Sequence, residues 1–247
     1  MQRAQYVIDP NRPAIANNVC ALAMMTKAPR AGQVKTRLVP PLTPEEAALL
    51  NVCFLRDTAA AIAKACATSA RGIGVYTPVG SEAAYIGILP RDFELLPQRG
   101  HGFGERPAFA AADLFQCGFT SVCLIDSDSP TVSADIYAQA VEQLSRPNDR
   151  VVLGPADDGG YYLIGMKRNY PELFERIDWS TGRVFDQTRQ RAREIKLDIS
   201  LLPTGYDVDD AATLRRLCDE LLSEKAIPDV APNTRKFLAE LAQTKKI

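Results

Sequence analysis

Short apolar runs alternate along the chain with longer segments whose apolar residues recur every three to four positions. The first run, residues 19–25 (VCALAMM), is apolar throughout, which is typical of a strand buried on both faces of a sheet. Thr43-Pro44-Glu45-Glu46 then combines an N-cap threonine, a proline at the first helical position and a glutamate at the third. We therefore expect a helix to begin there and to run to about Ala67.

The same alternation continues to the end of the chain. Further strands are predicted at residues 72–77, 93–97, 121–125, 150–153, 161–166 and 197–202, and helices at 104–117, 133–144, 182–195 and 210–225. This order predicts an α/β fold with a mixed, mostly parallel sheet flanked by helices. We expect a partly ordered N-terminal extension (1–18), one domain (19–226) and a C-terminal helical tail (227–247).

Composition narrows the classes of protein to which the chain can belong. Its 247 residues are 46% hydrophobic, enough for one large domain, and 29 basic against 30 acidic residues leave a net charge of −1 without a long basic block. Nucleic acid is therefore not expected as a partner. No apolar run approaches the roughly 20 residues of a membrane span, and the first 18 residues lack the apolar core of a secretory signal, so we expect a cytoplasmic protein.

Cysteine and histidine usage bears on the metal chemistry. Five of the six cysteines fall within apolar strand or helix patterns and no C-x-x-C occurs, which indicates reduced core thiols (Cys20, Cys53, Cys66, Cys123 and Cys218). His101 is the only histidine, so a multi-histidine zinc site is excluded and any metal must be bound by oxygen ligands.

Ligands of open α/β sheets bind beyond the carboxyl ends of the strands, so the polar segments that follow the strands are the candidates for a site. Residues 27–38 (KAPRAGQVKTRL) directly follow the first strand and contain four cations and a glycine. Such a loop suits phosphate oxygens, since Lys35 supplies a compact charge, Arg37 a bidentate fork and Gly32 close backbone approach. The Walker A spacing is absent, and a solvated basic connector is the alternative.

Asp126-Ser127-Asp128-Ser129-Pro130 follows the apolar run 122–125. Two carboxylates at positions i and i+2 can present oxygen ligands to Mg²⁺ or Mn²⁺, which would stabilise a diphosphate leaving group. The alternative is a turn in which Asp and Ser side chains bond to the local chain.

Two further acidic segments follow later strands. In residues 154–162 (GPADDGGYY), Asp157 or Asp158 would orient an acceptor hydroxyl, although Asp-Gly and Gly-Gly also make a good hairpin turn. In residues 206–210, Asp207 or Asp209 would complete a metal shell, whereas Asp209 would equally cap the helix that follows.

A glycine-rich loop, residues 97–106, opens a predicted helix whose N-terminus and arginines suit a phosphate or a nucleotide edge. His101 in this loop is interpreted as an exposed residue rather than a base. Trp179 would form either an acceptor wall or part of the core.

Together these motifs resemble a bacterial and archaeal family of predicted glycosyltransferases with the nucleotide-diphospho-sugar transferase (GT-A) fold, over about residues 19–222. The matching motifs are K-A-P-x-x-G-x-x-K-T-R-L, P-Q-x-G-x-x-x-G-E-R, S-D-S-P, G-P-x-x-D-G-G-Y-Y-L-I-G, the Trp179-Ser180-Thr181 segment and the D-V-D at 207–209. The family is also similar to guanylyltransferases of cofactor synthesis, whose basic loop binds nucleotide phosphates. One departure is Asp126, where the family usually has glycine.

The resemblance and the residue patterns together give the expected site. Phosphate or nucleotide contacts are assigned to Lys27, Gly32, Lys35, Arg37, Gln98, Gly104 and Arg106, and the metal, Mg²⁺ or Mn²⁺, to Asp126, Asp128 and Asp209. Catalysis is assigned to Asp157, Asp158 and Lys35, and the acceptor side to Gly159, Gly160, Tyr161 and Trp179.

Three functions remain open. The preferred one is metal-dependent glycosyl transfer from a nucleotide-sugar to a small acceptor. The alternative is nucleotidyl transfer with release of pyrophosphate, in which Lys35 and Arg37 face the β and γ phosphates. A non-catalytic nucleotide-binding protein is the third, and the clustered acidic residues count against it. The nucleotide base, sugar, acceptor, stereochemical outcome and oligomeric state do not follow from the sequence.

Overall fold

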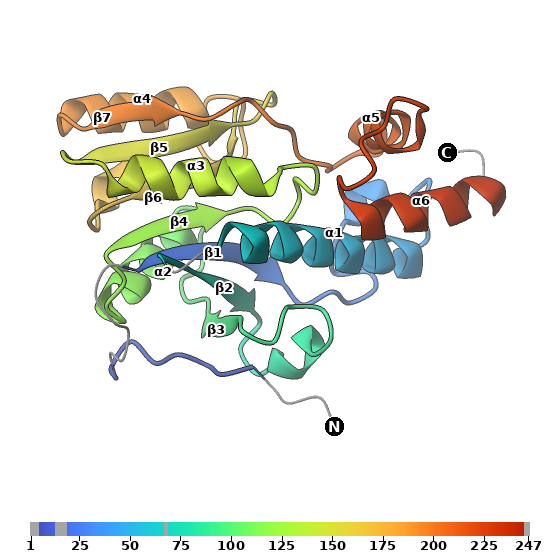
Figure 1. Cartoon of the computed structure of the whole chain (residues 1–247), viewed down its shortest axis with the longest axis horizontal. Helices are drawn as coiled ribbons and strands as arrows, with labels where there is room; N and C mark the ends of the chain where they lie inside the picture. Colours follow the sequence, from blue (N-terminus) through green and yellow to red (C-terminus); the bar gives the residue numbers. More distant parts are fainter. Residues whose placement is uncertain (1–4, 13–18, 67–68, 245–247) are drawn as a thin grey trace.

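The computed structural model describes residues 5–12, 19–66 and 69–244, and a seven-stranded sheet forms its centre (Figure 1). In spatial order the strands are β3 (Glu94–Pro97), β2 (Ala70–Thr77), β1 (Cys20–Lys27), β4 (Ser121–Ile125), β6 (Tyr161–Met166), β5 (Arg150–Pro155) and β7 (Asp198–Leu201). All described pairings are parallel except those of β6, which is antiparallel to both of its neighbours. The predicted mixed, mostly parallel sheet is confirmed.

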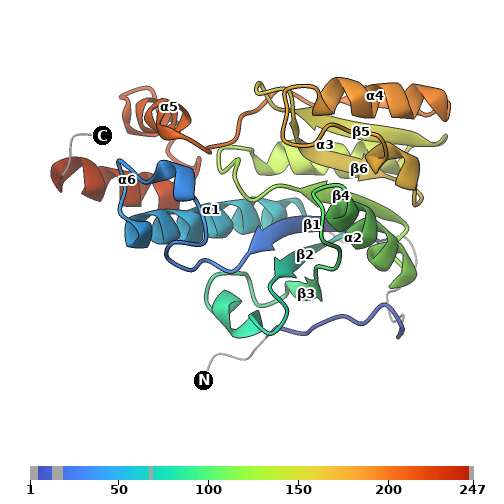
Figure 2. The same cartoon turned by 180° about the vertical axis from the view of Figure 1, so that it is seen from behind.

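Helices cover both faces of the sheet (Figures 1 and 2). On one face α1 (Pro44–Ala65) and α3 (Ala134–Ser145) pack on a cluster that includes Leu22 and Met24 of β1. On the other face α2 (Glu105–Gln116) and α4 (Val184–Glu194) pack on a cluster that includes Ala21 and Ala23. Because successive strand residues point to opposite faces, the fully apolar run of β1 supplies both clusters.

A third apolar cluster lies beside the sheet. It joins the first half of α1 to the short 3₁₀ helix η1 (Thr36–Leu38), to α5 (Ala211–Leu222) and to α6 (Pro232–Thr244). Asp57 of α1 caps α6, since its Oδ1 accepts from Asn233 N at 3.0 Å and its Oδ2 from Thr234 N at 2.8 Å. The C-terminal helix is thereby fixed to the element that follows the basic loop.

The predicted elements are present, with boundaries that differ by a few residues. Thr43 and Glu46 form the expected capping box of α1, which ends at Ala65; Ala67 lies outside the described residues. Asp210 rather than Asp209 caps α5, through Thr213. The predicted helical tail contains α6.

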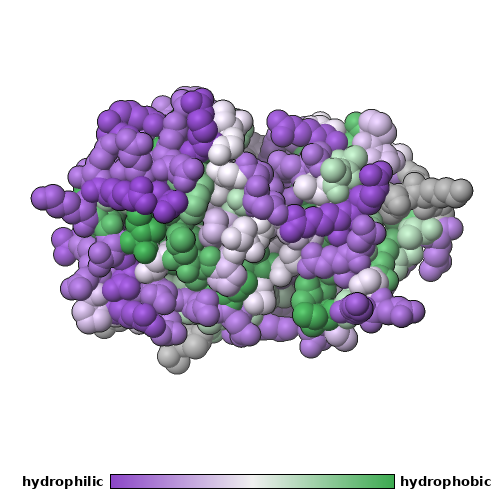
Figure 3. Space-filling view, turned by 90° about the horizontal axis from the view of Figure 1, so that it is seen from above, coloured by the Kyte–Doolittle hydropathy of each residue, from purple (hydrophilic) through white to green (hydrophobic). Residues whose placement is uncertain are grey.

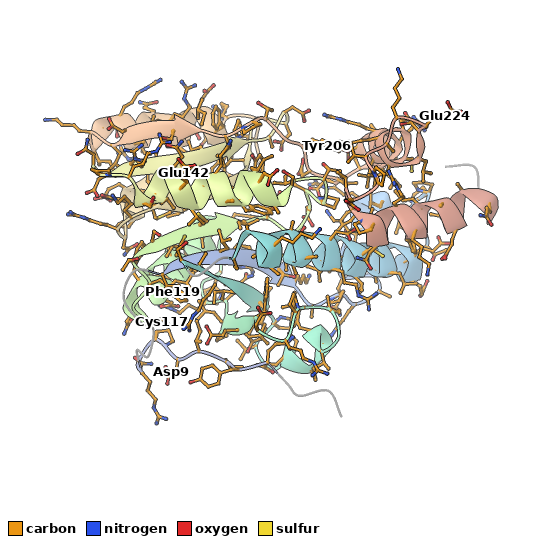
Figure 4. The ribbon with its side chains drawn as sticks, in the orientation of Figure 1. Asp9, Cys117, Phe119, Glu142, Tyr206 and Glu224 are labelled. Atoms are coloured by element: carbon orange, nitrogen blue, oxygen red, sulfur yellow. The ribbon has the colours of Figure 1, made fainter. Side chains whose placement is uncertain are left out.

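The N-terminal segment 5–12 lies along the edge of the sheet, where Ile8 N donates to Leu95 O and Leu95 N donates to Tyr6 O. Asp9 of this segment lies at the same end of the molecule as Cys117 and Phe119 (Figure 4). The opposite edge strand is β7, and the face seen from above is hydrophilic with apolar patches between (Figure 3).

All six cysteines are free thiols, as predicted, although Cys53 and Cys66 are only partly buried. Within residues 5–12, 19–66 and 69–244, none of the helices has the length and apolar character that crossing a membrane requires.

Candidate functional site

Two cavities open beyond the carboxyl ends of β1 and β4. The first, of about 260 Å³, is lined by Lys27, Gln33, Lys35, Arg37, Asn51 and Asp128, among others, and is called the basic cavity. The second, of about 410 Å³, is lined by Gln98, Phe103, Arg106, Asp126, Tyr161 and Trp179, among others, and is called the aromatic cavity. Both are also lined by Lys27, Ser127 and Asp128, so they adjoin along this wall.

The basic loop folds back on itself after β1. Lys27 Nζ donates to Gln33 O at 2.9 Å, and Gly32 adopts a φ of 71°, which glycine accepts at little cost. Arg37 is exposed and lines the basic cavity, and within the described part of the chain its side chain has no hydrogen bond or ion pair. Arg37 is thus positioned as an available cation, as the motif predicts.

Lys35 has a different environment from the other cations of the loop. Its ammonium group donates to Val208 O at 2.8 Å and lies 2.9 Å from Asp128 Oδ1 and 2.9 Å from Asp209 Oδ1. Only 5% of the side chain is exposed. Burial acts to lower the pKa of Lys35, but the two carboxylates outweigh it and the pKa is raised, so the group is charged. In this state Lys35 is bonded to the two acids, and it also forms part of the lining of the basic cavity.

Five aspartates from three segments form one group of interacting charges, of which two pair with Lys35 (Asp126, Asp128, Asp158, Asp207 and Asp209). Val208 N donates to Asp128 O at 2.9 Å, which ties the 206–209 segment to the end of β4. The pKa of Asp207 is raised to about 6, first by burial and then by the charges of Asp209, Asp158 and Asp128. Carboxylates that repel one another in this way favour a cation among them.

Asp126 lies deepest in this group. Its Oδ2 accepts from Ser129 Oγ at 2.7 Å, while its Oδ1 is buried without a hydrogen-bond partner among the described residues. Burial first, and the charge of Asp128 second, raise the pKa of Asp126 well above the usual range, which favours its neutral form. This hydrogen bond from Ser129 is of the kind expected for a local turn, which was the alternative to metal binding at residues 126–130.

The hairpin between β5 and β6 contains the expected turn, and it separates the roles of its two aspartates. Asp157 forms an ion pair with Arg216 of α5, whose guanidinium carbon lies 3.8 Å from the ring centroid of Tyr206, a residue labelled in Figure 4. Asp158 Oδ1 accepts from Gly160 N at 2.8 Å, and its charge helps to raise the pKa of Asp207. Asp158 therefore belongs to the acidic group, whereas Asp157 is paired outside it.

Close packing explains the glycines of this hairpin. Gly159 has a φ of 88°, and a Cβ there would lie 2.2 Å from Gly182 O, while Phe185 N donates to Gly159 O at 2.9 Å. The hairpin is therefore held against the 181–185 segment, next to Trp179.

The aromatic cavity combines the glycine-rich loop with the acceptor-side residues. Phe103 is 72% exposed, and Trp179 lines the cavity and packs against the core, so the core interpretation of Trp179 is confirmed and its role as an acceptor wall stays a prediction. A Cβ at Gly104 would lie 2.4 Å from Trp179 Nε1, so this glycine admits the indole.

Gln98 Nε2 donates to Thr26 O at 3.1 Å and to Val75 O at 2.7 Å, which joins the ends of three strands. Arg106 lines the cavity and has no ion pair in the described structure, whereas His101 is exposed, as predicted. Of the two arginines in this loop, Arg99 is paired with Asp113, so Arg106 is the one positioned to meet a ligand.

Two groups of the site were missed by the sequence reasoning. Asn51, in the middle of α1, is 4% exposed and lines the basic cavity, and its Oδ1 is buried without a partner among the described residues. The sequence does contain a signal for Asn51, because this polar residue follows the buried Leu50 and precedes the buried Phe54 and Leu55 by three and four positions on the same helix. The second group is the backbone carbonyl of Val208, which accepts from Lys35 and cannot be recognised from residue type.

The oxygens around Lys35 fit a hard divalent cation. Carboxylates of Asp128 and Asp209 and the Val208 carbonyl converge on one cationic atom, and Mg²⁺ and Mn²⁺ prefer such oxygen ligands. As arranged, Lys35 is bonded to two of these acids, and the described residues contain no group of three or more His, Cys, Asp or Glu side chains able to hold a metal.

Residues 60–181 match a family model described as "Uncharacterized protein conserved in bacteria (DUF2064)". No curated protein sequence matches the chain.

Among solved structures, a protein of Desulfovibrio desulfuricans G20 provisionally assigned as a nucleotide-diphospho-sugar transferase is 27% identical. The alignment covers 92% of this chain and 96% of that one, with a TM-score of 0.81. Rv0371c of Mycobacterium tuberculosis H37Rv, in complex with manganese, is 16% identical over 82% of this chain and 98% of its own, with a TM-score of 0.51.

A CMP:2-keto-3-deoxy-manno-octonic acid synthetase in complex with CTP is 11% identical over 93% of this chain and 100% of its own, with a TM-score of 0.52. These last two show a shared fold. With the Desulfovibrio protein they confirm the resemblance inferred from the motifs, and the chain is a transferase-class enzyme with the nucleotide-diphospho-sugar transferase fold.

Proposed function

We propose that this enzyme transfers a glycosyl group from a nucleotide-sugar to a small acceptor, with Mg²⁺ or Mn²⁺ bound. The observation that carries the proposal is the shared wall of Lys27, Ser127 and Asp128 between the basic and the aromatic cavities. A ligand that extends across this wall would place anionic groups in the basic cavity and an uncharged ring in the aromatic cavity. A nucleotide-sugar has this composition.

The basic cavity is the proposed phosphate site. Arg37 supplies an exposed fork for phosphate oxygens, and Lys27 supplies a second charge at the wall. Asp128 and Asp209 would hold the metal, which supplies positive charge to the departing diphosphate when it is bound. These groups would stabilise the negative charge that develops on the diphosphate as its bond to the sugar breaks. Interactions that are stronger in the transition state than in the ground state accelerate the reaction.

The aromatic cavity is the proposed site of the transferred group and the acceptor. Phe103, Tyr161 and Trp179 offer ring faces that suit the apolar face of a sugar or another small ring. Asp158 is the proposed base for the acceptor hydroxyl, since Asp157 is paired with Arg216.

Nucleotidyl transfer is the second candidate. The same fold occurs in the CTP-bound synthetase, and the exposed Arg37 would suit the outer phosphates of a nucleoside triphosphate equally well. In that reaction pyrophosphate leaves and the nucleotide is joined to the acceptor.

The first experiment is a thermal-shift screen of the protein against nucleoside triphosphates, nucleoside diphosphates and nucleotide-sugars, each with Mg²⁺, with Mn²⁺ or with EDTA. A ligand that binds the native state raises the melting temperature in a concentration-dependent way. We expect a cation-dependent rise with one nucleotide-sugar, and phosphorus NMR of the reaction to reveal a nucleoside diphosphate rather than pyrophosphate. Pyrophosphate would select the second candidate, and no rise with any nucleotide would refute both.

Arg37→Gln provides the site-specific test, with Arg30→Gln as its control, because both arginines are exposed on the same loop and only Arg37 lines a cavity. We expect about a tenfold loss of nucleotide affinity for Arg37→Gln, the size of one charged hydrogen bond, and less than a twofold change for Arg30→Gln. Equal losses would argue against the basic cavity as the phosphate site.

A further inference from the structure

We propose that Lys35 occupies the cation position of the ligand-free enzyme, so that a divalent metal enters only as the Lys35 ammonium leaves, and nucleotide and metal therefore bind together. The inference rests on the proposed function for the identity of the incoming ligand. Its core, competition between Lys35 and a metal for the same oxygens, is independent of any nucleotide.

The contacts of Lys35 are those of a bound cation. An ammonium group has three N–H donors, and three oxygens lie within 2.9 Å of this one, on Val208, Asp128 and Asp209. With 5% of its side chain exposed, Lys35 keeps little contact with water. A metal that takes Asp128 and Asp209 as ligands must therefore displace the lysine from both carboxylates.

The surroundings offer Lys35 a second position. The basic cavity adjoins it, and this cavity is also lined by Arg37 and by the buried, unpartnered carbonyl oxygen of Asn51. Phosphate oxygens placed there would accept the ammonium group that the carboxylates release. The exchange leaves two carboxylates with a divalent ion and pairs the lysine with the phosphates, so every charge keeps a partner.

Lys35 also has an uncommon backbone. It adopts a φ of 48° and a ψ of 37°, a left-handed conformation that costs a residue other than glycine about 1 kcal/mol or more. This conformation lies within the basic loop, at the residue that directly precedes η1. The side chain of Lys35 is therefore directed to the acids by a conformation that its own sequence does not favour.

The test is the affinity for Mn²⁺ alone, measured from the electron paramagnetic resonance signal of the free ion. We expect Lys35→Met to bind Mn²⁺ at least about tenfold more tightly than the wild-type protein. Lys27→Met is the matched control, because it removes the same charge from the wall of the same cavity without freeing Asp128 or Asp209. Equal affinities of the wild type and Lys35→Met, or an equal gain in both variants, would overturn the proposal.

A second measurement uses the wild-type protein and does not depend on the folding of the variant. Lys35 should resist acetylation in metal-free buffer, and its acetylation, followed by mass spectrometry, should rise when Mn²⁺ is added to saturation. Binding of Mn²⁺ without any rise would contradict the proposal. Failure of every nucleotide to bind would instead refute the proposed function and leave the Mn²⁺ result standing.

Discussion

At the scale of single residues, neighbouring side chains in this site differ because of their partners and not because of their type. Asp157 and Asp158 are adjacent and both exposed, but the first is paired with Arg216 and the second lies beside Asp207. In the same way, Arg37 is free to meet an anion in the basic cavity while Lys35 is held by two acids. A motif specifies residue types, whereas the availability of each charge follows from the packing.

This difference predicts unequal effects on the reaction. Asp158→Asn retains an oxygen that can accept from Gly160 N but removes the base, so we expect kcat to fall at least about a hundredfold, the usual contribution of general base catalysis. Asp157→Asn should lower kcat less than about fivefold. Steady-state kinetics with the donor found by thermal shift would measure both values. A larger loss for Asp157→Asn would transfer the proposed role to that residue.

Gly32 and Gly159, two of the described glycines with a positive φ, predict unequal effects on stability. A Cβ at Gly32, with a φ of 71°, meets no atom within 4 Å, so Gly32→Ala should cost only backbone strain of about 1 kcal/mol. Gly159→Ala adds a collision with Gly182 O, and we expect a total cost above about 2 kcal/mol. Urea denaturation of both variants would compare them, and similar midpoints would show that the hairpin can move away from residue 182.

At the scale of elements, helix starts were the features that local sequence determined best. Thr43 and Glu46 form a complete capping box in α1, whereas Ser133, at the start of α3, makes no capping hydrogen bond through its side chain. Thr43→Ala should therefore lower the free energy of unfolding by about 1 kcal/mol, and Ser133→Ala by much less. Differential scanning calorimetry would measure both, and equal losses would mean that the described caps do not set helix stability.

The strands were predictable for a similar reason, since apolar runs such as residues 121–125 are buried on both sides. The hairpin turn at 154–162 indicated the antiparallel pairing of β6 with β5, whereas the order of the other strands and the position of β6 beside β4 were not predictable, because they depend on pairing between distant segments. The same limit applied to the site. The motifs singled out Lys35, Asp128 and Asp209 in segments that follow strands, but only the fold brings Lys35 within 2.9 Å of both acids.

At the scale of the whole molecule, the third apolar cluster connects the site to the C-terminal helix. It contains Leu38 next to the basic loop, Val208 between the two acids of the D-V-D segment, and Leu238 of α6. The bonds of Asp57 to the first turn of α6 complete this connection. Packing of α6 therefore helps to hold the basic loop, residues 27–38, in its position.

Asp57→Ala tests this connection. The variant leaves Asn233 N and Thr234 N without their acceptor, so we expect a loss of about 1–3 kcal/mol and faster hydrogen exchange in α6 than in the sheet. Hydrogen exchange followed by mass spectrometry would resolve the two regions. Uniform acceleration over the whole chain would instead indicate that α6 unfolds only together with the sheet.

The wall of Lys27, Ser127 and Asp128 has a consequence for enzyme kinetics. Because both cavities use these residues, the proposed function predicts that a substitution there changes the Michaelis constants of the donor and the acceptor together. Arg37 lines only the basic cavity and Phe103 only the aromatic cavity, so changes at these positions leave the other constant largely as it was. Engineering the enzyme toward a new acceptor should therefore begin at Phe103, on the side of the wall that the donor phosphates do not reach.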